Sequence, residues 1–322
     1  MRRRALLAAQ GGALFAATLL PAPALAQLPG RPIRLVVPWA AGGTTDVQMR
    51  AFGDALSRHA GVPVVVDNKP GAGGMLGPQA LLHERPDGTT LCQMAVSVLH
   101  HAMLSPRPAF DALRDFTWVI GLTGYLFGVV VKPEAPWATF AEFMADAARN
   151  PGRRSYGTSG IGSTQHITME RITRARGLDW LHVPYKGVAE TVQAVLAGQV
   201  DAAAASSVWS AAVRQGSLRL LCTWGAERAP RFANVPTLRE SGLDIVSESP
   251  YGLAGPRGMD PGLVRALHDV LNAALHDPAH LAVLERLDMP LRHMDSAAYA
   301  AFAERQSAED REMFRALGTR IE

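Results

Sequence analysis

Residues 33–46 read IRLVVPWAAGGTTD. The apolar, β-branched residues from Ile33 to Pro38 predict a buried strand. The glycines after it allow a tight loop, and a helix is expected from about Asp46 to His59. Thr45 and Gln48 have the spacing of a capping box at the start of that helix. A strand, a glycine-rich loop and a helix in this order are typical of an α/β fold.

The same order of elements returns along the chain. Further strands are predicted at 62–66, 89–96, 127–131, 155–158, 181–185, 200–205 and 218–223. Further helices are predicted at about 75–84, 139–150, 163–176 and 189–196, and the chain after Asp260 is mostly helical, with breaks at Pro278 and Pro290. Two βαβ blocks and a helical tail predict two lobes. We assign residues 27–128 and 226–322 to the first lobe and 129–225 to the second, so the chain crosses between lobes more than once.

The N-terminal residues have the three parts of a secretory signal. Arg2, Arg3 and Arg4 precede an uncharged apolar stretch, which ends before the small–x–small site at Ala24-Leu-Ala26. We therefore predict a signal peptide over 1–26, cleavage before Gln27, and export to the periplasm. A retained membrane anchor is the alternative, and the short apolar core disfavours it. The Arg-Arg-x-Leu-Leu pattern leaves the choice between Sec and twin-arginine export open.

The net charge of +3 comes from the three arginines of this predicted signal. Removing three Arg lowers the 32 Lys and Arg to 29, which equals the 29 Asp and Glu. A neutral mature protein argues against a nucleic-acid partner. No later run of 18 or more apolar residues exists, so we expect the mature protein to be soluble. Cys92 and Cys222 lie in apolar, strand-like runs; buried thiols and a disulfide both remain open.

Three loops join a strand to a helix start, at 38–46, 68–74 and 157–163. Ligands of open α/β sheets bind beyond the carboxyl ends of strands. Helix N-termini there favour an anion, and glycines let the backbone approach it. Turn chemistry alone explains any one such loop, but three together favour a site. Since Lys69 is their only cation, we predict a carboxylate held by N–H and O–H groups rather than by a salt bridge.

Enzyme motifs are incomplete. The segment Gly157–Ile161 resembles a nucleophile elbow, but isoleucine stands where G-x-S-x-G requires its last glycine. Ser163 and His166 could be a nucleophile and a base, although a helix cap explains the serine equally well. No paired C-x-x-C or H-E-x-x-H motif occurs. We therefore expect no catalysis, no cofactor and no metal, with a periplasmic serine hydrolase using Ser159 or Ser163 as the less favoured alternative.

At these loops the chain resembles the tripartite tricarboxylate transporter substrate-receptor family, also called Bug receptors. The resemblance covers nearly the whole mature chain, and many short motifs in order carry it. They are Arg31–Pro38, Ala40–Asp46, Asp67–Gly74, Pro86–Gly88, Asp115–Thr117, Tyr156–Ser163 with His166, Val183–Gly187, Gly198–Asp201, Val235–Thr237 and Gly252–Pro256. Met75 departs from the family, which usually has asparagine there, and Trp39 is bulkier than usual.

The resemblance implies a type II periplasmic-binding-protein-like fold, with two α/β lobes, a ligand cleft and hinge crossovers. It implies a monomeric receptor that closes on a small organic carboxylate, such as a dicarboxylate or an amino acid, and delivers it to membrane transporter subunits. A ligand sensor in a signalling system is an alternative. We expect the hinge near Val129 and Leu220.

The resemblance also implies the ligand-binding residues. From the first lobe these are Trp39, Ala41, Gly42, Gly43, Thr44, Asp46, Gly73, Gly74 and Ser97. From the second they are Thr158, Gly160, Gly162, Ser163, His166, Tyr185, Lys186 and Asp201. Some have simpler explanations: Asp46 can favour its helix N-terminus, Lys186 can be solvated, and Asp201 can cap a turn.

Overall fold

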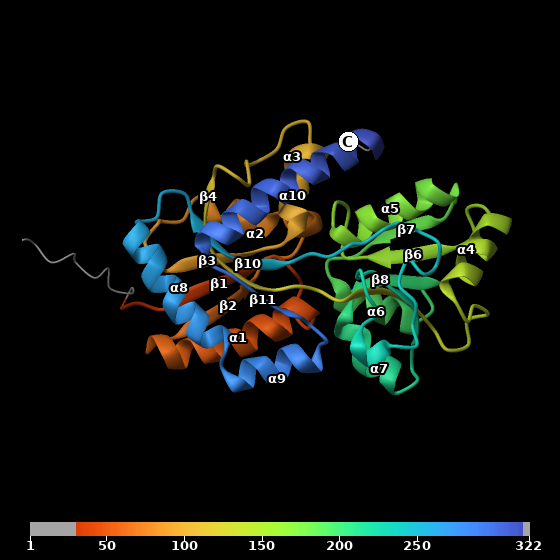
Figure 1. The fold of residues 1–322 in the computed structure, drawn as a ribbon, viewed down its shortest axis with the longest axis horizontal. Helices are drawn as coiled ribbons and strands as arrows, with labels where there is room; N and C mark the ends of the chain where they lie inside the picture. The colour runs from red at the N-terminus through yellow and green to blue at the C-terminus, as the bar shows by residue number, and fades with distance from the viewer. Residues whose placement is uncertain (1–29, 318–322) are drawn as a thin grey trace, which may run out of the picture.

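The computed structural model describes residues 30–317, which form two lobes that are each built on one β-sheet (Figure 1). The predicted signal peptide lies outside the described residues. None of the described helices is long and apolar enough to cross a membrane.

The sheet of the first lobe has six strands in the order β11-β4-β10-β3-β1-β2. They are β1 (Ile33–Val37), β2 (Val64–Asn68), β3 (Thr90–Met94), β4 (Phe116–Thr123), β10 (Tyr251–Pro256) and β11 (Leu291–Met294). Strand β1 runs parallel to β2 and β3, whereas β10 lies antiparallel between β3 and β4. The C-terminal part of the chain therefore returns to the sheet that contains β1.

The sheet of the second lobe has five strands in the order β7-β6-β8-β5-β9. They are β5 (Phe127–Val131), β6 (Ser155–Thr158), β7 (Leu181–Pro184), β8 (Ala202–Ser206) and β9 (Arg219–Thr223). Strand β6 is parallel to β7 and β8, and β5 is antiparallel to β8 and β9. The parallel strands of both sheets send their carboxyl ends toward helix starts.

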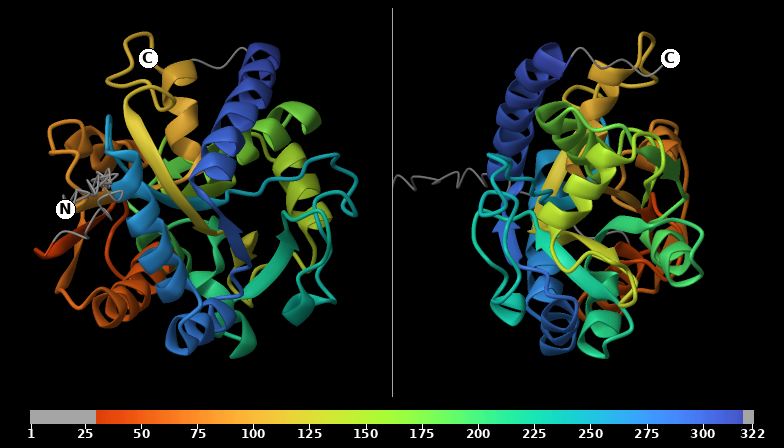
Figure 2. Two further views of the ribbon diagram at one scale, coloured as in Figure 1. Left: turned by 60° about the vertical axis from the view of Figure 1, so that its left-hand side comes forward. Right: turned by 90° about the vertical axis from the view of Figure 1, so that its right-hand side faces the viewer.

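Helices connect and cover the sheets. They are α1 (Thr44–Ala60), α2 (Leu76–Leu81), α3 (Val96–Leu104), α4 (Phe140–Arg149), α5 (Thr164–Arg176), α6 (Val188–Leu196), α7 (Ser210–Arg214), α8 (Pro261–Leu275), α9 (Pro278–Arg286) and α10 (Ser296–Leu317), with 3₁₀ turns at Ala72–Gly74, Ser207–Trp209 and Pro230–Phe232. Local chemistry fixes several starts: Asp260 and Asp277 cap α8 and α9, and each helix has proline at its first position. Helix α10 lies along α3 (Figure 2), where His100 and Asp310 approach to 3.1 Å.

The predicted strands and helices occur in the predicted order, but β4, β10, β11, α3 and α7 were not predicted. The predicted capping box of α1 is wrong: Gly43 is the N-cap and makes no side-chain bond, while the Thr45 hydroxyl lies 2.6 Å from that of Tyr125. The strand predicted at 89–96 ends at Met94, and the apolar run continues from Val96 as helix α3.

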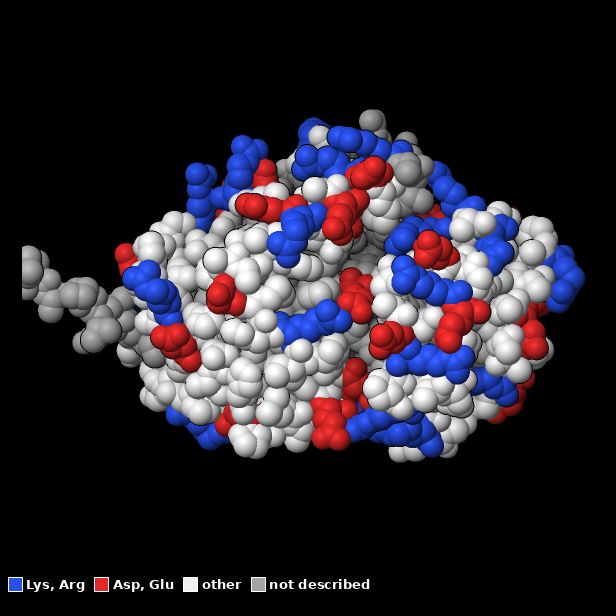
Figure 3. All heavy atoms as spheres, viewed as in Figure 1, with Lys and Arg blue, Asp and Glu red and all other residues white. Residues whose placement is uncertain are grey.

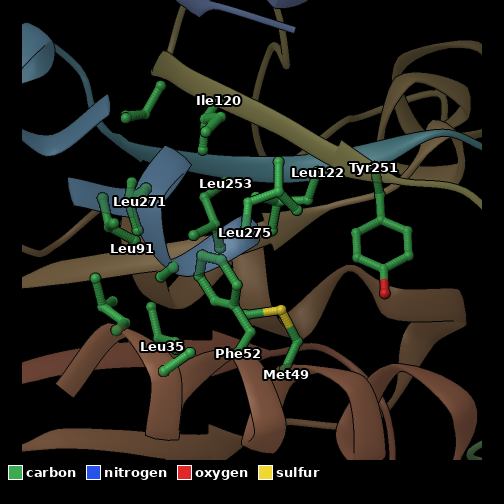
Figure 4. Packing of buried hydrophobic residues seen from close by; sticks show 14 of the residues in the cluster. Leu35, Met49, Phe52, Leu91, Ile120, Leu122, Tyr251, Leu253, Leu271 and Leu275 are labelled. Atoms are coloured by element: carbon green, nitrogen blue, oxygen red, sulfur yellow. The ribbon is translucent and has the colours of Figure 1, made fainter. Parts of the chain in front are cut away.

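Each lobe has its own apolar core. In the first, side chains from β1, α1, β3, β10 and α8 interdigitate, among them Leu35, Phe52, Leu91, Leu253 and Leu271 (Figure 4). All five are fully buried. Cys92 belongs to a cluster of the first lobe and Cys222 to the core of the second, and both are buried free thiols. The buried-thiol alternative is therefore the one the structure shows.

The chain crosses between the lobes at residues 124–126 and 224–250 (Figure 1). Val129 and Leu220, near which the hinge is expected, are buried and paired inside the second sheet, so the connections between the two sheets lie outside these two residues. Leu238 and Ile245 also pack in the second core. The division into lobes remains a prediction, and this packing favours a second crossover near Pro250 rather than at residue 226.

Candidate functional site

A small cavity lies between the lobes, beyond the carboxyl ends of β1, β3, β6 and β8. Its volume is about 20 Å³, which holds roughly one water molecule. It is lined by Trp39, Ala40, Gly43, Thr44, Thr45, Ala95, Ser97, Tyr125, Phe127, Ser159, Thr164, Gln165, Val188, Ser206 and Ser249. None of these described residues is charged at neutral pH, so the polar groups of the lining are hydroxyls, amides and an indole.

Helices from both lobes begin at this cavity. First-turn residues line it from α1 (Thr44, Thr45), α3 (Ser97) and α5 (Thr164, Gln165). The first N–H groups of a helix have no partner within it and carry partial positive charge. Because helices of opposite lobes contribute such ends, the cavity favours an anion without a cationic side chain.

Hydroxyl groups connect the lobes across the cavity. Thr44 Oγ1 accepts hydrogen bonds from Ser206 Oγ and from the Val208 amide, both at 3.0 Å. Within the second lobe, Ser159 Oγ donates to Gln165 Oε1 at 3.0 Å. The lining is thus a set of adjustable donors and acceptors that can exchange partners with a polar ligand.

Ser97 differs from its neighbours. Its side chain is 1% exposed and its hydroxyl has no hydrogen-bond partner among the described residues. A buried polar group without a partner is costly, and the Ser97 hydroxyl lines the cavity. It therefore marks a position that a polar ligand atom would satisfy.

Glycines let loops of the two lobes touch. A Cβ atom added to Gly73 would overlap the Ile161 carbonyl oxygen, and one added to Gly187 would lie 3.0 Å from Ala40 Cβ. A Cβ atom added to Gly160 would lie 3.4 Å from the backbone of Gly73. The glycine-bearing loops of the two lobes therefore meet at one inter-lobe crevice, as the carboxylate hypothesis requires.

Asp46 supports the first loop and does not line the cavity. Its carboxylate accepts from the Gly42 amide and from Asn68 Nδ2, both at 2.9 Å, and pairs with Arg50. Burial acts to raise the Asp46 pKa, but the hydrogen bonds outweigh burial and hold the pKa below its ordinary value. Ala41 and Gly42 are exposed and also lie outside the lining.

The predicted residues in and next to the Gly160–Gly162 loop are hydrogen-bonded to one another. Ser163 caps α5: its hydroxyl donates to the Gly160 carbonyl at 2.7 Å and accepts from the His166 amide at 3.3 Å. His166 Nδ1 accepts from the Gly162 amide at 3.2 Å, and burial lowers the His166 pKa, with Glu170 acting in the opposite direction. The Ser163 hydroxyl is thus committed to backbone groups, and within residues 30–317 no hydrogen bond joins it to an imidazole.

The other predicted residues divide by position. Trp39 lines the cavity, donates from Nε1 to Gln93 Oε1 at 3.1 Å, and covers Gly74 with its ring. The Thr158 hydroxyl lies 2.7 Å from His182 Nε2 and supports the loop from behind. Asp201 lies at the opposite end of the second sheet. Tyr185 and Lys186 line an outer groove with Gly73 and Gly160.

Asp201 accepts bonds from the Ser155 amide at 2.8 Å and from its hydroxyl at 3.0 Å. Ser155 begins β6, whereas the cavity lies beyond the end of that strand. The structure therefore does not bring Asp201 to the site.

Several lining residues were not predicted. They are Ala40, Ala95, Tyr125, Phe127, Thr164, Gln165, Val188, Ser206 and Ser249, and Thr45 and Ser159 also line the cavity without being among the predicted ligand-binding residues. Ser206 could have been predicted as a site residue, because it is the last residue of a parallel strand and ligands bind beyond the carboxyl ends of such strands. Tyr125 and Ser249 lie in the crossover segments, where no local pattern marks them.

Comparison with known proteins agrees with this architecture. A family described as "Tripartite tricarboxylate transporter family receptor" matches residues 48–319. A protein of Cupriavidus necator, described as a UPF0065 protein in the gbd 5' region, is 42% identical over 323 residues, covering 99% of this chain and 98% of the relative.

Solved structures give the same result for the fold. The periplasmic binding protein BugD is 26% identical, with a TM-score of 0.87 over 91% of this chain and 99% of BugD. MatC of Rhodopseudomonas palustris with bound malate is 26% identical, with a TM-score of 0.84 over 88% of this chain and 99% of MatC. An R. palustris protein with adipate is 26% identical, with a TM-score of 0.84 over 90% and 98%. The predicted type II periplasmic-binding-protein-like fold is confirmed.

Proposed function

This chain belongs to the tripartite tricarboxylate transporter receptor family, and from that premise we propose that it captures a small organic carboxylate between its lobes and delivers it to a membrane transporter. The uncharged cavity at which helices of both lobes begin carries the proposal. The malate and adipate bound by its structural neighbours support the ligand class.

Capture requires the lobes to move. A cavity of about 20 Å³ is too small for a carboxylic acid, so the ligand enters a more open form. The crossovers at 124–126 and 224–250 are the connections about which the lobes rotate. The ligand stabilises the closed form because it binds groups from both lobes, which shifts an existing equilibrium.

The proposed receptor is a non-catalytic monomer of the periplasm, exported with cleavage before Gln27. Its cleft serines support the absence of catalysis, because Ser159 and Ser163 donate to Gln165 and to the Gly160 carbonyl rather than to a base. Incubation with an activated ester should give no turnover. Turnover that Ser163→Ala abolishes would favour the hydrolase alternative.

Ser97 gives the direct test. Calorimetry of the mature protein against a panel of organic acids should find a ligand. Ser97→Ala should then weaken the binding of that acid by about 1.5–3 kcal/mol, because a hydrogen bond to a charged group is lost. Ser217→Ala, in an exposed turn of the second lobe, is the matched control and should bind normally. Equal affinity of the two variants would remove Ser97 from the site.

A further inference from the structure

A second cavity adjoins the first and shares Ser97 with it. Its volume is about 440 Å³, within the range typical of small-molecule sites. Its lining includes Met75, Ser97, Leu104, Arg107 and Ile161. We call it the outer chamber. The unpartnered Ser97 hydroxyl stands at the junction of the two cavities.

The walls of the outer chamber are largely apolar and come from both lobes. Met75 and Leu104 are buried residues of the first lobe, and Ile161 of the second lobe is 46% exposed. An exposed isoleucine beside a cavity offers apolar surface to a ligand. Among the described residues that line the chamber, Arg107 alone is charged.

We propose that the ligand is a carboxylic acid with an extended apolar body, aliphatic or aromatic, rather than a short polar diacid. This inference rests on the proposed function. The carboxylate lies at the helix starts beside Ser97, and the apolar body fills the outer chamber between Met75, Leu104 and Ile161. Arg107 in the lining disfavours a cationic group on that body.

The arrangement couples the apolar body to lobe closure. Met75 directly follows the second loop of the first lobe, and Ile161 belongs to the facing loop of the second lobe. A methylene chain or a ring between them loses contact with water only when the loops meet. A short diacid such as malate lacks an apolar body, so it leaves the side chains of Met75, Leu104 and Ile161 in contact with water.

A chain-length series tests the inference. The mature protein is titrated calorimetrically with butanoate, hexanoate, octanoate and malate. Burying each added methylene gains up to about fourfold in affinity, so octanoate should bind at least about tenfold more tightly than butanoate, and malate should bind more weakly than octanoate. The proposed function fails if no organic acid binds. The inference alone fails if acids bind but affinity does not rise with chain length.

Matched variants place the effect in the outer chamber. Ile161→Asn should reduce the octanoate-to-butanoate affinity ratio at least about fivefold, because an amide replaces apolar wall. Leu181→Asn makes the same kind of change at a leucine of this lobe that is 54% exposed and lies outside the chamber, and it should leave the ratio unchanged. An unchanged ratio in Ile161→Asn, or an equal fall in both variants, would overturn the assignment.

Discussion

Asp46 is a buried charge beside a cavity whose own lining is uncharged. The side chain is 4% exposed and binds Gly42, Arg50 and Asn68, which fixes the first loop in place. The family resemblance implied a ligand contact for Asp46, and the structure gives it a supporting role. A sequence pattern marks a residue as part of a loop, but it does not say whether its side chain faces the ligand or the backbone of the loop.

The depressed pKa of Asp46 predicts a pH-dependent contribution to stability. In the unfolded chain, an aspartate side chain has a pKa of about 3.9, and the pKa of Asp46 in the folded protein is lower. The stabilisation is therefore complete above the unfolded pKa and is lost as pH falls through the folded pKa. Asp46→Asn should lower the free energy of unfolding by about 2 kcal/mol at pH 7, and the deficit should shrink below pH 4.

Urea unfolding at pH 7, 5, 4 and 3 measures that deficit. Asp54→Asn, at an exposed position of the same helix α1, is the control and should change stability little at any of these values. A deficit for Asp46→Asn that is the same at pH 7 and pH 3 would contradict the role of its charge.

At the scale of elements, the predicted strand–loop–helix units were the most reliable part. Strands β1, β5, β6 and β9 and the start of α5 lie within a residue or two of their predicted bounds. Helix α3 was missed because Val96–Leu104 continues the apolar run of β3, and composition does not show where a strand gives way to a helix. Ser97 was still placed at the site, since either element would begin or end there.

The cap of α5 links helix stability to loop shape. Ser163→Ala removes the acceptor of the His166 amide and the donor to the Gly160 carbonyl, so it should lower the free energy of unfolding by about 1 kcal/mol. It should also weaken acid binding several-fold, because the Gly160–Gly162 loop loses its support. Denaturant unfolding and calorimetry measure the two effects.

Thr139→Ala provides the comparison, since Thr139 caps α4 by accepting from the Glu142 amide at 3.2 Å and lies outside the cavity. It should lower stability by a similar amount, about 1 kcal/mol, and leave affinity intact. If both variants bind equally well, the Ser163 cap has no part in recognition.

At the scale of the molecule, the sequence predicted two lobes and facing loops, but not the strand pairing that sets where the chain crosses between them. The crossovers depend on β10 pairing with β3 and β4, strands that lie more than a hundred residues earlier in the chain, and no local pattern encodes such pairing. Charges of both signs are interspersed over the face shown in Figure 3, in keeping with the equal numbers of acidic and basic residues after residue 26. How the lobes meet is therefore seen in the structure, from the contacts of Gly73 with Ile161 and of Gly187 with Ala40.

Gly73 of the first lobe lies against the Ile161 backbone of the second lobe. Its φ of +62° already disfavours a side chain, and an added Cβ would overlap the Ile161 carbonyl oxygen of the other lobe. Gly61, at the end of α1, has a φ of +67° and open space around it. Alanine at either position costs about 1 kcal/mol of backbone strain, but only Gly73→Ala also obstructs the approach of the lobes.

We therefore expect Gly73→Ala and Gly61→Ala to unfold with similar free energies, whereas acid affinity falls at least about tenfold in Gly73→Ala alone, because the binding-competent closed form becomes rarer. Small-angle scattering at saturating ligand should show a larger radius of gyration for Gly73→Ala than for Gly61→Ala. Equal affinity and equal dimensions in the two variants would mean that the loops at Gly73 and Ile161 do not come together when the ligand binds.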